Sequence, residues 1–189
     1  AIFSMFGSDP QASPDYPRIV SSSALARLSA YLKEGKIVLG GAMDPEDLYL
    51  EPTVLELAKP EAGVWQEEIF GPVLPLKEFD QIQEALQFIN KREKPLALYY
   101  FSRNKKNIRL IVNSTSSGGV CINDTLLHVA NHRLPFGGVG QSGMGQYHGK
   151  YSFKTFSRNK AIVCSSSNID IPLKYPPYKG KLTLLRKLF

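Results

Sequence analysis

Hydrophobic positions in the first third of the chain change from helical to extended spacing. Leucines recur every three or four residues within 21–35, after a run of serines and before a glycine, which predicts an amphipathic helix. The stretches 36–41 and 49–57 carry short apolar runs and predict strands. Because proline cannot donate a hydrogen bond to a sheet, Pro52 favours an edge position for the second of these strands.

The middle of the chain alternates strand and helix patterns, which is typical of an α/β fold with a mainly parallel sheet flanked by helices. Apolar runs at 73–79, 96–101 and 119–122 predict three strands, and the last two read as strands buried on both faces. Asp80 and Asn104 are good N-cap residues and precede two amphipathic helices between these strands. The residues expected to face the core from these helices are Ile82, Ala85, Leu86, Ile89, Ile108, Ile111 and Val112.

This alternation ends beyond Gly149. Residues 151–164 show no helical period and predict a long extended arm. Such an arm often adds to a sheet edge, sometimes that of a neighbouring subunit. The rest of the chain holds three prolines and is expected to be irregular as far as a basic and apolar end at 181–189.

The composition is that of a globular protein, with 43% hydrophobic and 21% charged residues. No apolar run approaches the roughly 20 residues that a membrane-spanning helix needs. The first residues do not show a signal-peptide pattern. The absence of an initiator methionine suggests a piece of a longer protein. Its two cysteines are fewer than a secreted disulfide scaffold uses, so we expect a reducing, cytoplasmic compartment.

Positive charge is concentrated near the C-terminal end. Residues 1–149 hold 14 Lys and Arg against 16 Asp and Glu (net −2), whereas residues 150–189 hold 9 against 1 (net +8). No nucleic-acid motif accompanies this basic tail, so we expect no nucleic-acid partner. An anionic membrane surface or a partner subunit fits the charge at least as well.

Three patterns resemble known sites but lack the context that those sites need. Residues 138–143 match the dinucleotide fingerprint without a buried strand before them or a helix after them, which favours a close-packed backbone loop. His128 and His132 have no third ligand candidate and are interpreted as polar loop histidines. Cys121 has apolar neighbours and is interpreted as a buried structural cysteine, with a cysteine hydrolase as the weaker alternative.

The most specific pattern lies at residues 66–73. Glu68 and Phe70 are two residues apart, so in an extended segment their side chains point to the same side. A carboxylate can accept hydrogen bonds from a vicinal diol while an aromatic ring packs on the sugar, which suggests a sugar receptor. The alternative is a solvated acidic pair, Glu67 and Glu68, before an anchoring phenylalanine.

Several spaced motifs together resemble the C-terminal half of the aldehyde dehydrogenase superfamily. The similarity covers nearly the whole chain up to residue 177. Details at 89–99 and 143–150 are similar to its class 3, fatty-aldehyde-dehydrogenase branch. The superfamily motifs are Glu67-Glu68-Ile69-Phe70-Gly71-Pro72, Pro95-Leu96-Ala97-Leu98, Ser117-Gly118-Gly119-Val120 with Asn123, and Leu134-Pro135-Phe136-Gly137-Gly138.

The resemblance implies oxidation of medium-chain, long-chain or aromatic aldehydes to carboxylic acids, with NAD or NADP as the coenzyme. Glu68 would hold the hydroxyls of the nicotinamide ribose, Phe70 would pack against the ribose and ring, and Phe136 would line the aldehyde pocket. The family's nucleophilic cysteine, general-base glutamate and nucleotide-binding domain lie upstream of the matched region. We therefore expect no catalytic residue in this chain, and no activity from the chain alone.

The resemblance also divides the chain into a partial catalytic domain at 1–150, an extended oligomerisation arm at 151–175 and a basic, irregular tail at 176–189. We expect a homodimer formed through residues 151–166, and a cytoplasmic protein whose basic tail associates peripherally with membranes. The alternative is a non-catalytic dimerisation or interaction module of the same family. A Gly-Gln-x-Cys motif upstream of Ala1 would favour the enzyme, and a start codon there would favour the module.

Overall fold

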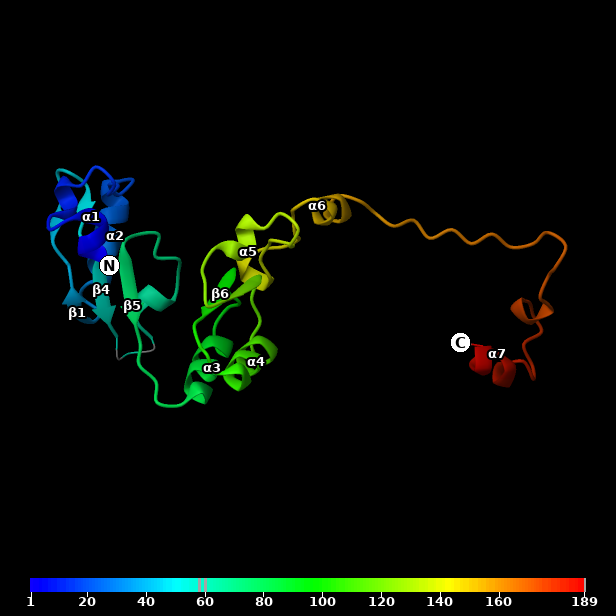
Figure 1. Ribbon diagram of the computed structural model, residues 1–189. Helices are drawn as coiled ribbons and strands as arrows, with labels where there is room; N and C mark the ends of the chain where they lie inside the picture. The colour runs from blue at the N-terminus through cyan, green and yellow to red at the C-terminus, as the bar shows by residue number, and fades with distance from the viewer. Residues whose placement is uncertain (58, 60, 189) are drawn as a thin grey trace. The chain divides into compact units, whose positions relative to one another are not determined.

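The chain forms two compact units, Ala1–Phe88 and Ile89–Phe189 (Figure 1). The computed structural model describes residues 1–57, 59 and 61–188. Helix α3 (Ile82–Asn90) crosses from one unit to the other along the sequence.

Helix α2 (Ser22–Tyr31) provides one side of the core of the first unit. It begins after Ser21, whose hydroxyl accepts a hydrogen bond from the backbone N–H of Ala24 at 3.2 Å and so satisfies one of the free donors of the first turn. Leu25 and Leu28 are buried on the same face as Tyr31. The helix predicted from the leucine spacing is confirmed.

A three-stranded sheet of β1 (Lys36–Leu39), β4 (Thr53–Glu56) and β5 (Val73–Leu76) provides the other side of this core. Strand β4 pairs antiparallel with β1 and parallel with β5. The edge position predicted for the strand after Pro52 is therefore wrong, because β4 is the central strand. Pro52 precedes the hydrogen-bonded residues, and the first backbone N–H of β4 donates to the carbonyl of Pro72 at 2.8 Å.

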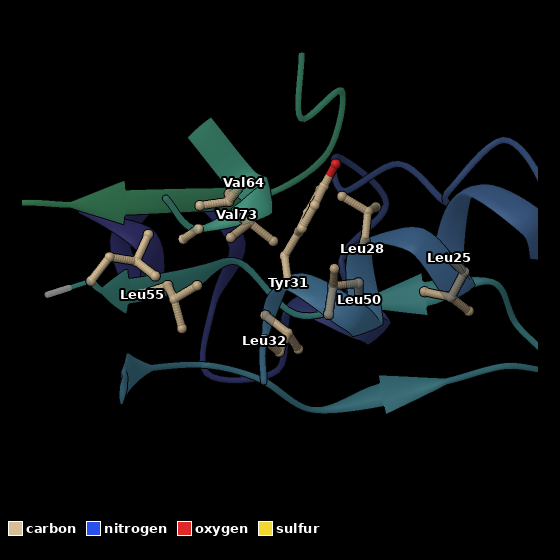
Figure 2. Close-up of a cluster of buried hydrophobic side chains, with 10 residues drawn as sticks. Leu25, Leu28, Tyr31, Leu32, Leu50, Leu55, Val64 and Val73 are labelled. Carbon is tan, nitrogen blue, oxygen red and sulfur yellow. The ribbon is translucent and has the colours of Figure 1, made fainter. Parts of the chain in front are cut away.

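The core of the first unit lies between α2 and this sheet (Figure 2). Leu28, Leu50 and Leu55 are its most deeply buried side chains, and each contributes about 1.5–3 kcal/mol of transfer free energy. The shorter elements of the unit are α1 (Ile2–Phe6), η1 (Pro10–Ala12), η2 (Gly63–Trp65) and the antiparallel pair β2 (Met43–Asp44) and β3 (Tyr49–Leu50).

The second unit contains a parallel strand pair with a helical connection. Strand β6 (Ala97–Tyr100) leads to α4 (Lys105–Ser114), which returns the chain to β7 (Gly119–Ile122). The Asn104 side chain caps α4 by accepting from the backbone N–H groups of Lys106 and Asn107. The predicted order of strand, capped helix and parallel strand is confirmed.

The predicted burial of these strands on both faces is wrong within the described chain. Strand β7 is half-buried throughout, and Leu96, Tyr99 and Phe101 at and beside β6 are exposed. A sheet of two four-residue strands has too little neighbouring structure in its unit to cover both faces. Val112, expected to face the core from α4, is exposed as well, whereas Ile111 is buried.

Beyond the strand pair, the described residues of the second unit form several short helices. They are α5 (Leu127–Ala130), η3 (Gly140–Ser142), α6 (Lys150–Thr155), η4 (Pro172–Lys174) and α7 (Leu182–Leu188).

The prediction of an extended arm over 151–164 is wrong at its start, where α6 forms. Gly149 takes φ 48°, which turns the chain so that its carbonyl accepts the N–H of Phe153. Residues 157–166 have no regular structure. Among the helices that the structure describes, none has the length and apolar character needed to cross a bilayer.

Candidate functional site

Residues 66–72, called the strip here, connect η2 to the start of β5 on the surface of the first unit. Glu68 is exposed, and 75% of Phe70 is exposed. Ile69 between them packs against the hydrophobic core. An acidic and an aromatic side chain are therefore exposed to solvent on either side of Ile69, which anchors the strip to the core.

The strip is not a regular extended segment. Phe70 has φ 46°, in the left-handed region that a bulky side chain rarely adopts. This corrects the expectation of a plain extended backbone. A conformation of this kind costs about 1–3 kcal/mol and persists only where the surrounding structure imposes it.

The exposed carboxylate of Glu68 has no hydrogen-bond donor among the residues that the structure describes. Its oxygens can therefore accept hydrogen bonds from a ligand without first breaking internal ones. The ring of Phe70, two residues away, offers a flat apolar surface of the kind that stacks on a sugar or a heteroaromatic ring. The residues present thus fit a nicotinamide riboside.

Phe136, the residue expected at the aldehyde pocket, is half-buried in the second unit. Its backbone forms a two-way bridge with Tyr147, with N···O distances of 3.1 and 2.9 Å. Its ring contacts the rings of Tyr147 edge-on at 5.6 Å, His128 at 5.6 Å and His148 at 6.2 Å between centroids. Phe136 is therefore held in an aromatic cluster.

His128 is buried on α5, which corrects its interpretation as a polar loop histidine. Neither of its ring nitrogens has a hydrogen-bond partner among the described residues. His148 is also buried, and its Nδ1 lies 3.0 Å from the carbonyl oxygen of Leu134. His128, Tyr147 and His148 lie 8 to 12 positions from Phe136 and meet it through the folded loops between them, so a periodicity within one helix or strand could not have identified them.

The glycine-rich stretch forms a close-packed loop. A Cβ on Gly138 would lie 2.1 Å from the carbonyl oxygen of Ser142, and Gly143 has φ 152°. The single turn of η3 stands where a dinucleotide fingerprint would need a full helix. The sequence prediction of a backbone loop is confirmed.

The remaining candidate residues of the second unit are Cys121 and His132. Cys121 is half-buried rather than buried, because β7 is not covered on both sides. The described residues contain no group of three or more side chains suited to binding a metal ion. His132 has its ring 4.8 Å from that of His148.

The parallel pairs β4–β5 and β6–β7, with α3 between β5 and β6 and α4 between β6 and β7, define the chain as an α/β protein, as predicted. A sequence profile of the aldehyde dehydrogenase family matches residues 7–162. The chain therefore belongs to the aldehyde dehydrogenase family.

Known proteins similar to the chain agree with this assignment and with the class 3 resemblance. Aldehyde dehydrogenase family 3 member A2 of Mus musculus is 50% identical over 186 residues, which cover 97% of this chain and 38% of that protein. The dimeric NADP-preferring aldehyde dehydrogenase of Canis lupus familiaris is 46% identical over 185 residues, covering 97% of the chain and 41% of the relative.

A solved structure, the substrate-bound state of AldH from Staphylococcus aureus, superposes with a TM-score of 0.81 at 44% identity, covering 99% of this chain and 41% of that one. The chain thus spans 38–41% of the length of these proteins.

Proposed function

We propose that this chain supplies the coenzyme strip and part of the aldehyde pocket of a class 3 aldehyde dehydrogenase. The observation that carries the proposal is the exposure of Glu68 and Phe70 on either side of the core-packed Ile69, within a chain of this family. We call the protein that contains this chain together with the rest of the family's fold the complete enzyme. It converts an aldehyde to a carboxylic acid.

The coenzyme would be NAD or NADP, which accepts the hydride released by the aldehyde carbon. The Glu68 carboxylate would accept hydrogen bonds from the two ribose hydroxyls, and the Phe70 ring would pack against the ribose and the nicotinamide. This pairing restricts rotation about the glycosidic bond and so presents one face of the nicotinamide to the substrate. One relative is named NADP-preferring, which supports a nicotinamide coenzyme without choosing between the two forms.

The substrate would be a medium-chain, long-chain or aromatic aldehyde. Phe136 would form part of its apolar wall, because its ring is half-buried and fixed by Tyr147 and His148. A wall fixed on several sides holds a hydrophobic chain in one position while its carbonyl reacts.

The proposal is tested with Glu68→Gln in the complete enzyme. The amide accepts weaker hydrogen bonds than the carboxylate, so hydride transfer should slow by about ten- to hundredfold, the equivalent of one charged hydrogen bond. Single-turnover absorbance of the reduced nicotinamide measures that step. The rate of thiol acylation by an activated ester should stay unchanged, because no coenzyme takes part in it.

Glu78→Gln serves as the matched control, since Glu78 is also an exposed acid near β5 but lies outside the strip. Unchanged single-turnover kinetics in Glu68→Gln would remove Glu68 from the coenzyme site. A complete protein that produces no reduced nicotinamide from any aldehyde would favour the alternative of a non-catalytic interaction module.

We also infer that the complete enzyme is a cytoplasmic homodimer that associates peripherally with membranes. Residues 157–166 lack regular structure and carry exposed apolar side chains, which supports pairing with a second subunit. Similarity to an aldehyde dehydrogenase that is named dimeric also supports a homodimer. Exposed leucines and basic residues on α7 support contact with an anionic lipid surface.

A further inference from the structure

Helix α2 and the strip touch directly through Leu28 and Gly71. Leu28 has no exposed surface, and a Cβ on Gly71 would lie 2.6 Å from both of its methyl carbons. Only a residue without a side chain lets the strip approach the helix this closely. The backbone just after Phe70 is therefore seated on the core face of α2.

Arg27, the neighbour of Leu28 on α2, holds the backbone of the strip at two successive carbonyls. Its Nη2 donates to the carbonyl oxygen of Ile69 at 2.7 Å, and its Nη1 lies 3.3 Å from that of Glu68. The planar guanidinium presents its donors in a fixed fork, so it fixes the orientation of both peptide groups. With these carbonyls turned toward α2, the Glu68 and Phe70 side chains remain exposed.

Tyr31 and Glu67 complete this arrangement. The Tyr31 hydroxyl donates to the Glu67 carboxylate and accepts from Arg27 Nη1 at 2.9 Å, and Glu67 lies 3.8 Å from the same Nη1. Figure 2 shows the Tyr31 side chain extending from α2, with its hydroxyl at the edge of the cluster of core side chains. Burial, followed by the Glu67 hydrogen bond, raises the pKa of Tyr31.

We propose that Arg27, supported by Tyr31 and Glu67, is a positioning residue that holds Glu68 and Phe70 in the geometry that binds the coenzyme. This inference rests on the proposed function of the strip. The left-handed backbone of Phe70 needs neighbours that impose it, and the two carbonyl contacts of Arg27 and the Leu28 contact of Gly71 surround that residue. The ion pair itself is solvent-exposed, so the backbone hydrogen bonds carry the effect.

The test compares Arg27→Met with Arg18→Met in the complete enzyme. Both arginines lie in the first unit, both donate to backbone carbonyls, and their side chains are similarly exposed, at 30% and 32%. Arg18 bonds Asp47, Tyr16 and Gln11, away from the strip. Loss of the charged hydrogen bonds in Arg27→Met should raise the dissociation constant of the nicotinamide coenzyme about tenfold.

The aldehyde KM should stay unchanged in Arg27→Met, and Arg18→Met should leave both constants unchanged even where it lowers the melting temperature. Arg27→Lys keeps the charge but can reach one carbonyl at a time, so we expect an intermediate dissociation constant. Tyr31→Phe loses the hydrogen bonds of the hydroxyl to Glu67 and Arg27 but keeps both carbonyl contacts of Arg27, so it should have a smaller effect than Arg27→Met. These milder variants keep the test decisive if Arg27→Met does not fold.

Phe70→Ala separates failure of this inference from failure of the proposed function. If Phe70→Ala weakens coenzyme binding and the Arg27 variants do not, the positioning role is wrong and the strip remains the coenzyme site. If neither Phe70→Ala nor the Arg27 variants change coenzyme binding, the strip is not the coenzyme site and both proposals fall. Equal weakening in Arg27→Met and Arg18→Met would show a general loss of stability and would also overturn the positioning role.

Discussion

The imidazole of His128 occupies the space beside Gly119 that a side chain would need. A Cβ on Gly119 would lie 2.5 Å from Cδ2 of His128. The imidazole has little room to move, because its centroid lies 5.7 Å from that of Tyr99 and 5.6 Å from that of Phe136. His128 therefore joins the start of β7 to the aromatic cluster around Phe136.

Gly119→Ala should destabilise the complete enzyme by about 1–3 kcal/mol, because the added methyl group overpacks a site that cannot expand. The measurement is the thermal unfolding midpoint, followed by near-ultraviolet circular dichroism. His128→Ala in the same protein creates the missing space, so the double variant should be more stable than the sum of the two single losses predicts. Strict additivity of the two losses would contradict the packing described here.

Single residues of the candidate site were predictable only where their role is local. Glu68 and Phe70 could be singled out because an acid and an aromatic two residues apart form a pattern within the strip itself. Arg27 could not, because its contacts reach residues 41 and 42 positions further along the chain. The burial of His128 could not be predicted either, because it depends on the ring of Tyr99 in β6, 29 positions away, as well as on that of Phe136.

Helices could be predicted from the sequence where a capping residue or the spacing of hydrophobic residues acts within one or two turns. Ser21 and Asn104 both cap the helices that their positions predicted. The order of strands in a sheet depends on partners far away in sequence, and β4 proved central although Pro52 suggested an edge. The sequence does not predict helix α6, because six residues are too few to show a helical period.

Helix α7 is the element expected to contact a membrane surface. Lys181 precedes it, Arg186 and Lys187 lie in its last turn, and Leu182 and Leu184 are exposed. Each basic residue near an anionic bilayer contributes about 1 kcal/mol, so replacing all three by glutamine should weaken binding to vesicles by roughly a hundredfold. Sedimentation with phosphatidylcholine vesicles, with and without phosphatidylserine, measures the complete enzyme's affinity.

Lys105→Gln with Lys106→Gln is the control for α7, because both side chains are exposed basic residues on α4. That pair should leave vesicle binding unchanged. Added salt should weaken the wild-type interaction, since surface charges are screened within about 10 Å at 0.1 M ionic strength. Binding that does not depend on phosphatidylserine or on the α7 residues would rule out the electrostatic contact.

At the scale of the whole molecule, the α/β class could be predicted because β4–β5 and β6–β7 are joined by segments long enough for parallel crossovers. The extent of burial could not be predicted from the same pattern. The run of apolar residues at 96–101 reads as a fully covered strand, yet the unit provides one parallel partner and leaves Leu96 and Phe101 exposed. Periodicity reports which residues favour burial, and not how much structure is present to cover them.

Residues 157–166 expose apolar side chains on a segment without regular structure. Ile162 and Val163 are 72% and 89% exposed, and no described residue hydrogen-bonds to the backbone of residues 158–165. Free N–H and C=O groups together with β-branched side chains favour addition to the edge of another sheet. A second copy of the enzyme would supply such an edge in a homodimer.

Ile162→Asp combined with Val163→Asp should therefore weaken dimerisation of the complete enzyme by about tenfold or more, because pairing would bury two uncompensated carboxylates. Sedimentation velocity over a range of protein concentrations measures the shift toward monomer. Ile169→Asp is the matched control, since Ile169 is 70% exposed but lies beyond the proposed pairing segment. If the double variant sediments as the same dimer as the wild type, residues 157–166 do not form the subunit contact.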